Sequence, residues 1–136
     1  MSVPLSKRKE GQLTVITKAR DLRIYTIRVC CTESNFPKRY RWCITNNIVS
    51  KVNEITDSII AANEVKVESA SDKTRRLERQ RTALELTSVL LDNIGTAYDV
   101  FHFKSSTLEF WTRQIVDVQN LLRAWIRSDA ARYSNI

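Results

Sequence analysis

The feature of this chain that most constrains its fold is a long apolar stripe near the C-terminus. Between residues 108 and 125 the apolar positions recur at spacings of 3, 4, 3, 4 and 3, at Leu108, Trp111, Ile115, Val118, Leu122 and Trp125. This repeat places one continuous face of a helix against partner helices. The tryptophans make the face large, since an aromatic side chain buries about 150–250 Å². Because a single helix cannot cover such a face, the rest of the chain has to supply helices that do.

The composition favours long helices over short strands. The chain has 136 residues but only two glycines and two prolines, whereas a β-rich fold needs turn residues at every hairpin. Hydrophobic periodicity predicts four helices, at about residues 11–34, 41–66, 71–101 and 105–130. We therefore expect one all-α domain over residues 11–136, an antiparallel up-down-up-down four-helix bundle. Residues 1–10 are expected to form a flexible basic arm.

Two details of the last helices are also predicted. Ser71 or Asp72 is expected to cap the third helix, and Ser105 or Ser106 the fourth. The inner face of the third helix is expected to follow Leu77, Leu84, Leu91 and Tyr98 at seven-residue intervals, and to be widened by Ala83, Leu86, Leu90, Ile94 and Ala97.

The net charge of +7 is concentrated at one end of the chain. Residues 1–41 contain ten Lys/Arg and three Asp/Glu, which gives +7, while residues 42–136 contain twelve of each. An excess of cations on a neutral body indicates a polyanionic partner, with nucleic acid the first candidate. The alternative, a charged face that only keeps the protein soluble, is equally compatible with the charge.

The residues that usually support catalysis or metal binding are scarce. His102 is the single histidine, and no glycine-rich phosphate loop or Glu-x-x-His motif is present. Cys30, Cys31 and Cys43 are an odd set without Cys-x-x-Cys spacing, which indicates reduced thiols rather than disulfides or a metal site. We expect no catalytic residues, no cofactor and no metal. No membrane-spanning stretch or signal peptide is visible, so a cytoplasmic location is expected.

Three clusters of cations are candidate nucleic-acid contacts. The first is Lys38, Arg39 and Arg41, in a segment that also carries Phe36 and Trp42. Cations and exposed aromatics can contact phosphates and stack on unpaired bases, but packing at the end of the bundle is favoured for both Phe36 and Trp42. The other clusters lie at helix ends. Arg75 and Arg79 are near the start of the third helix, where a solvated helix start is the favoured alternative. Arg123, Arg127 and Arg132 lie along the fourth, where the alternative is a favourable interaction of the cations with the helix C-terminus.

Several segments, taken in order, resemble one protein family. They are Phe36-Pro37-Lys38-Arg39-Tyr40-Arg41-Trp42, Ala62-Asn63, Trp111, Leu121-Leu122-Arg123-Ala124-Trp125, Ser128-Asp129 and Arg132-Tyr133. Together they resemble the four-helix-bundle proteins related to the accessory variability determinant (Avd) of diversity-generating retroelements. That superfamily includes proteins encoded by intervening sequences in ribosomal RNA genes. The resemblance runs from about residue 13 to 133.

The resemblance implies a homopentamer with a positive surface that associates with a reverse transcriptase and its template RNA. In that role the protein would support mutagenic cDNA synthesis without catalytic residues of its own. The cations of the matching segments, Lys38, Arg39, Arg41, Arg123 and Arg127, are the implied RNA contacts, and DNA is a second possible polyanion. The contrasting hypothesis is a structural or protein-interaction bundle with no retroelement role.

Overall fold

The computed structural model describes the backbone of residues 5–136 and the side chains of residues 14–136. Within this part of the chain the structure is all-helical, as predicted. The α-helices are α1 (Leu5–Cys30), α2 (Asn46–Glu64), α3 (Ala70–Phe101) and α4 (Ser105–Arg132). Two short helical turns precede α2, the 3₁₀-helix η1 (Lys38–Tyr40) and the π-helix η2 (Arg41–Thr45). None of the described helices is long and apolar enough to cross a bilayer.

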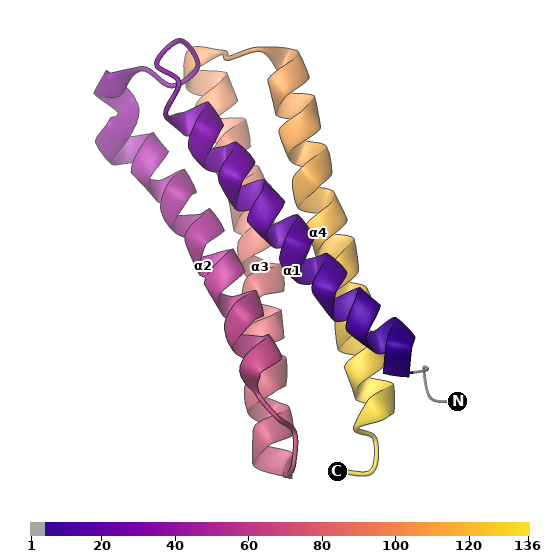
Figure 1. Cartoon of the computed structure of the whole chain (residues 1–136). Helices are drawn as coiled ribbons and strands as arrows, with labels where there is room; N and C mark the ends of the chain where they lie inside the picture. Colours follow the sequence, from indigo (N-terminus) through magenta and orange to yellow (C-terminus); the bar gives the residue numbers. More distant parts are fainter. Residues whose placement is uncertain (1–4) are drawn as a thin grey trace.

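The four helices lie side by side along one axis (Figure 1). α2 packs most closely against α3, and α1 contacts α2 and α4, while α4 also packs against α3. The α1–α2 and α3–α4 links lie at one end of the long axis, and the α2–α3 link lies at the other end with the C-terminus (Figure 1). The two ends of this arrangement therefore carry different parts of the sequence.

The apolar stripe of α4 forms the centre of the core. Five of its six residues are buried, and Leu108 at its start is half-buried. The indole of Trp111 is fully enclosed, and its Nε1 donates a 2.9 Å hydrogen bond to Thr26 Oγ1 on α1. This bond satisfies the polar atom of a side chain that is otherwise suited to the core. The stripe was therefore predicted correctly from its spacing.

Helix boundaries differ from the prediction at the first two helices. α1 begins at Leu5, so residues 5–10 are helical and the predicted arm is wrong there, while residues 1–4 lie outside the described part. Lysine, arginine and glutamate favour helix, so a polar sequence need not interrupt one. α1 ends at Cys30, before the predicted residue 34, and a turn follows in which Phe36 N donates to Thr32 O at 2.9 Å.

The start of α3 is fixed by a capping box. Ser69, not Ser71 or Asp72, is the N-cap, and its hydroxyl accepts a 3.2 Å hydrogen bond from the backbone N–H of Asp72. The Asp72 carboxylate in turn accepts from the N–H of Glu68 at 3.1 Å. The hydrogen bond from Glu68, and after it one with the Ser69 side chain, lowers the pKa of Asp72. The pairing satisfies the N–H of Asp72 in the first helical turn and the N–H of Glu68 just before the cap.

The predicted cap of α4 is also wrong. Its N-cap is Lys104, which has no side-chain cap hydrogen bond, instead of Ser105 or Ser106. The link from α3 to α4 is only three residues long, and His102 adopts a left-handed conformation there with φ of 46°. The tightness of this turn places the first serine inside the helix already.

Candidate nucleic-acid interface

The first candidate cluster is held by an aromatic group at one end of the bundle. Phe36 is buried, with ring centroids 4.9 Å from Phe101, 5.5 Å from Phe103 and 5.9 Å from Trp111. Edge-to-face and offset contacts at these distances are favourable beyond the area they bury. We call this group, together with Tyr40, the aromatic end. The prediction that Phe36 packs into the bundle is correct.

The 3₁₀ turn that carries Lys38 and Arg39 rests on the same group. The ring of Tyr40 stacks on Phe101 with centroids 4.9 Å apart and an interplanar angle of 22°. The Arg39 guanidinium carbon lies 5.2 Å from the centroid of the Tyr40 ring, within the range of a cation–π contact. The backbone of this cationic segment is thus attached to the core through two aromatic side chains.

Trp42 does not pack, which contradicts the prediction for this residue. Its side chain is 84% exposed, the most exposed of the large hydrophobic side chains in the described part of the chain. The physical reason is its position relative to Ile44, which packs against the core from the same helical turn, Arg41–Thr45. Residues two positions apart point to nearly opposite sides of a helix, so Trp42 lies on the outside.

The three cations of this cluster differ in their surroundings. Lys38 Nζ pairs with Glu33 Oε1 at 3.0 Å, and both side chains are largely exposed. Such a surface pair contributes little, about 0–1 kcal/mol, so it competes weakly with another anion. Arg39 and Arg41 are exposed and have no ion pair among the described residues. Two guanidinium groups therefore remain available beside the exposed indole.

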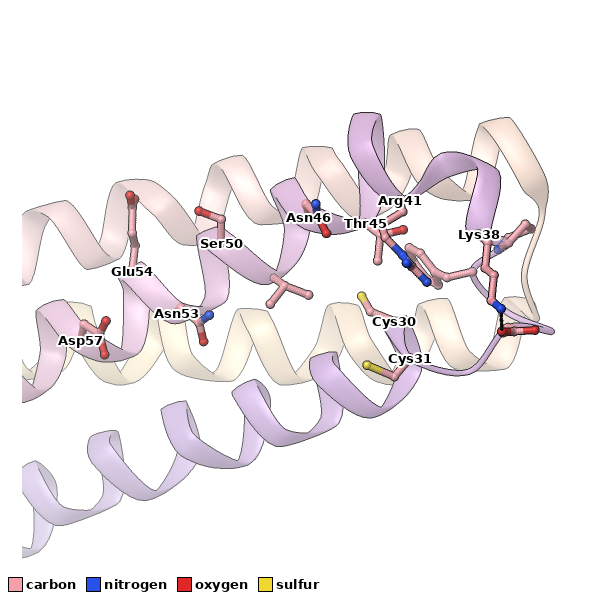
Figure 2. Close-up of a pocket in the computed structure, with 14 residues that line it drawn as sticks. Cys30, Cys31, Lys38, Arg41, Thr45, Asn46, Ser50, Asn53, Glu54 and Asp57 are labelled. Carbon is pink, nitrogen blue, oxygen red and sulfur yellow. Dashed lines mark ion pairs between the residues drawn. The ribbon is translucent and has the colours of Figure 1, made fainter.

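An open groove of about 690 Å³ runs from this cluster along the junction of α1 and α2. Lys38 and Arg41 line one end of it, and Glu54 and Asp57 lie further along α2 (Figure 2). Its charge thus changes from positive to negative along its length. A continuous phosphate backbone suits the cationic end alone.

The Cys30 thiol lies at the wall of this groove but is buried. Burial, and to a smaller extent the neighbouring Cys31, raises the pKa of Cys30 to about 12. A thiol with so high a pKa is protonated at neutral pH and is a poor nucleophile or metal ligand. Among the described residues no group of three or more His, Cys, Asp or Glu side chains could hold a metal ion.

The remaining candidate arginines lie at the opposite end of the molecule. All four are exposed: Arg75, Arg79, Arg123 and Arg127. Arg75 pairs with Asp72 at 3.4 Å, and Arg123 donates to Asn120 Oδ1 at 3.3 Å. The 26 residues of α3 between Arg75 and Phe101 rise about 1.5 Å each, so this end is roughly 40 Å from the aromatic end. The predicted site residues therefore form two separate surfaces.

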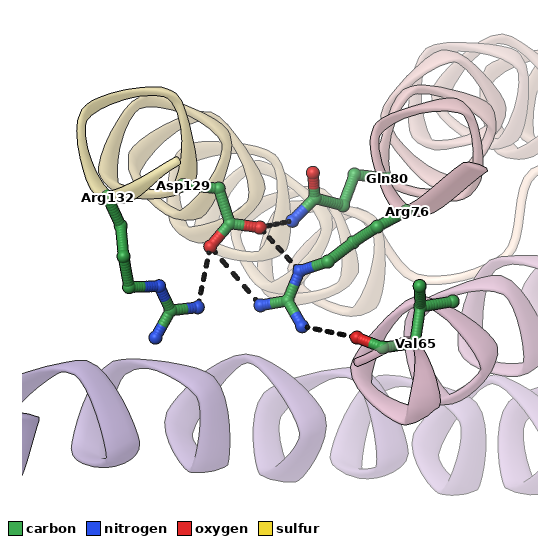
Figure 3. A network of polar contacts seen from close by, with 5 residues as sticks. All are labelled: Val65, Arg76, Gln80, Asp129 and Arg132. Carbon is green, nitrogen blue, oxygen red and sulfur yellow. Dashed lines mark hydrogen bonds and ion pairs between the residues drawn. The ribbon is translucent and has the colours of Figure 1, made fainter. Parts of the chain in front are cut away.

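A buried ionic network lies beneath this second surface, and the sequence interpretation missed it. Arg76 on α3 and Asp129 on α4 form a bidentate pair, with Nε–Oδ2 at 2.6 Å and Nη2–Oδ1 at 3.2 Å (Figure 3). Arg76 also donates to the carbonyl of Val65 at 3.3 Å. Gln80 and Arg132 donate to the same carboxylate at 2.8 and 2.9 Å. We call Arg76, Gln80, Asp129 and Arg132 the polar end.

The network corrects the interpretation of two cations. Arg132 was grouped with Arg123 and Arg127 as a possible phosphate contact, but it is partly buried and bound to Asp129. Arg76 belongs to the cationic run at the start of α3, yet only 4% of it is exposed. Its guanidinium carbon also lies 5.1 Å from the Trp125 ring centroid. Both guanidinium groups bind the Asp129 carboxylate, whose single negative charge offsets one of the two positive charges, and the enclosed Arg76 takes no part in an outer surface.

Comparison with known proteins gives no further guide. No family model, curated protein or solved structure matches this chain.

Proposed function

We propose that this protein is a non-catalytic nucleic-acid-binding accessory protein of a diversity-generating retroelement, as its resemblance to the Avd family implies. In this role an antiparallel up-down-up-down bundle, assembled as a homopentamer, associates with the element's reverse transcriptase and template RNA. It thereby supports mutagenic cDNA synthesis. The observation that carries the nucleic-acid part is the exposed Trp42 beside Arg39 and Arg41.

Electrostatics and chemistry at the aromatic end support this proposal. Phosphate contacts by Lys and Arg release counterions and provide most sequence-independent affinity for nucleic acid. Arg39 and Arg41 are exposed cations, and Lys38 has only a weak surface partner. Arg79, Arg123 and Arg127 supply a second cationic surface at the far end, where a long RNA or a neighbouring subunit could reach them.

Self-association is supported by exposed apolar side chains on α1 and α4. Ile24, Ile27 and Phe110 are 47%, 38% and 46% exposed. Exposed apolar surface of this kind favours assembly. We expect a mass above that of the monomer in light scattering at tens of micromolar. A monomer under these conditions would contradict the oligomeric part of the proposal.

The RNA part is tested by the salt dependence of binding. The variant K38A/R39A/R41A is expected to bind RNA more weakly and to lower the slope of log K against log salt by about 2, since each phosphate contact on a single strand contributes about 0.7. The control K18A/K66A/R113A removes the same charge from exposed positions outside the aromatic end and should leave most of the slope intact.

Two results would reject this proposal. Absence of micromolar RNA binding by the wild type at low salt would leave the structural or protein-interaction bundle as the better function. Equal losses in both triple variants would mean that only net charge matters. The retroelement role has its own test: a reverse transcriptase should be encoded beside this gene, should co-purify with the protein, and should synthesise more cDNA in its presence.

A further inference from the structure

We propose that the Trp42 surface recognises unpaired nucleotides, with a base stacked on the indole of Trp42 and the flanking phosphates bound by Arg39 and Arg41. This inference rests on the proposed function and names its ligand class as single-stranded nucleic acid rather than duplex. It gives Trp42 the role of stacking on a base, whereas the predicted nucleic-acid contacts are all lysines and arginines.

The first argument is the contrast between Trp42 and the other two tryptophans. Trp111 and Trp125 are 0% and 5% exposed, whereas Trp42 is 84% exposed. Among the described residues no ring or guanidinium lies in stacking contact with Trp42, although most aromatic side chains near it are in such contacts. An indole in this position has open faces, which is what stacking of a base requires.

The second argument is the support beneath Trp42. Tyr40, two residues earlier, stacks on Phe101, and Phe36 is enclosed in the aromatic end. The chain then passes through η1 and η2 directly into α2, so Trp42 stands on helical backbone. A side chain on a fixed backbone loses less conformational freedom on binding than one on a loose loop. Trp42 is therefore a preorganised platform.

The third argument is the neighbouring charge. Arg41 lines the cationic end of the groove (Figure 2). It precedes Trp42 in the sequence, and Arg39 lies on the 3₁₀ turn just before it. Single-strand binding sites combine cations that follow the backbone with aromatics on which bases stack. In a duplex the base faces are already stacked on one another, so a duplex could use the arginines but not the indole.

A protein partner is the competing occupant. Interface cores are depleted in lysine but enriched in tryptophan and arginine, so the residue types of the segment 38–42 do not by themselves distinguish the two occupants. A protein partner is disfavoured by the lack of further exposed apolar side chains along this part of the chain. None of the other exposed large hydrophobic side chains of the described residues lies in the segment from residue 28 to 59. The local sequence thus lacks the apolar surroundings that would seal a protein contact.

The experiment compares single-stranded and duplex RNA of equal length against wild type, Trp42→Ala and Trp42→Phe, at fixed salt. For single strands, Trp42→Ala should weaken binding about 5- to 150-fold, which corresponds to a stacking contribution of about 1–3 kcal/mol. Trp42→Phe should recover part of the loss, because a phenyl ring also stacks. Duplex binding should be unchanged. The salt slope should be the same in all three proteins, since stacking involves no counterions.

Intrinsic fluorescence provides a second measurement on the same samples. Wild-type emission should be quenched by single-stranded RNA, and Trp42→Phe should abolish that change because Trp111 and Trp125 are enclosed. Equal weakening of single-strand and duplex binding by Trp42→Ala would overturn base stacking and leave the proposed RNA-binding function standing. A loss of self-association with RNA binding unchanged would assign Trp42 to a protein interface instead. Denaturant unfolding checks that Trp42→Ala retains wild-type stability, as expected for an exposed side chain.

Discussion

Cationic side chains are exposed at one end of the molecule and buried at the other. At the aromatic end the interior is closed by rings, and the positive side chains Arg39 and Arg41 stay outside. At the polar end Arg76 enters the interior, where Asp129 compensates its charge. In sequence the two regions look alike, since both are dense in lysine and arginine. The two ends differ because the polar end contains the buried carboxylate of Asp129, which binds its cations inside the protein. The cations of the aromatic end have no such partner and stay accessible to a ligand.

Folding stability and ligand binding depend on different ends of the molecule. Burial of a charge is costly unless the charge is paired and hydrogen-bonded, so the polar end depends on every member of its network. The aromatic end depends on shape and area, which tolerate exchange of similar side chains better. We therefore expect substitutions at the polar end to affect folding and substitutions of the exposed residues of the aromatic end to affect binding.

The largest effect is expected from Asp129→Ala. This change leaves the Arg76 guanidinium buried without its counter-charge and removes the acceptor shared by Gln80 and Arg132. Breaking a buried pair in this way costs about 3–5 kcal/mol. The measurement is the free energy of unfolding in urea at neutral pH.

Two further variants define the origin of that effect. Asp117→Ala removes an exposed carboxylate from the same helix and should change stability by about 0.5 kcal/mol or less. Arg76→Met should cost less than Asp129→Ala, because the carboxylate keeps Gln80 and Arg132 as donors. If Asp129→Ala were as mild as Asp117→Ala, the polar end would not be a buried network.

The fold was largely predictable because large apolar residues at helical spacing have few alternatives to burial. The stripe of α4 shows this, since Trp111, Ile115 and Leu122 are all fully enclosed. The inner face of α3 was predicted only in part by the same rule. Leu77, Leu84, Leu91 and Tyr98, taken as its centre, are only half-buried. Four of the residues expected to widen it are buried, namely Ala83, Leu90, Ile94 and Ala97, and the prediction missed the buried Arg76, Gln80 and Thr87.

The correct face of α3 did have a signal in the sequence. Its residues are spaced 4, 3, 4, 3, 4 and 3 apart, as regular a repeat as that of α4. Its polar residues were missed because leucine is more hydrophobic than arginine and glutamine and was therefore expected to be buried. Arg76 is compatible with the interior only because it pairs with Asp129, which lies 53 residues away in the sequence. The candidate site was less predictable still, because residue type alone does not distinguish the exposed Trp42 from the buried Trp111 and Trp125.

A smaller effect is expected from Phe36→Leu at the aromatic end. The leucine keeps most of the apolar volume but loses the ring contacts with Phe101 and Phe103, so the cost should be about 1–2 kcal/mol. The matched change Trp42→Leu, six residues later, alters an exposed side chain and should cost about 0.5 kcal/mol or less. A loss at Phe36 equal to that of Asp129→Ala would remove the proposed difference in tolerance between the two ends.

The smallest effect is the pH dependence contributed by Cys30. Burial raises the pKa of this thiol from 9.0 to about 12, so folding favours the neutral form. A raised pKa of this kind stabilises the folded state fully below pH 9, and the contribution is lost as the pH rises from 9 toward 12. The stability difference between wild type and Cys30→Ala should therefore fall by about 1 kcal/mol between pH 9 and pH 10.

Taking the difference between the two proteins cancels other groups that titrate in this range, among them Tyr25, whose pKa is raised by burial. Thiol labelling gives an independent check, in which Cys31 and Cys43 react in the native protein and Cys30 reacts only on unfolding. A pH-independent difference for Cys30→Ala, together with native labelling of Cys30, would mean that the aromatic end opens to solvent. Its outer cations would then lack the fixed support on which the binding proposal depends.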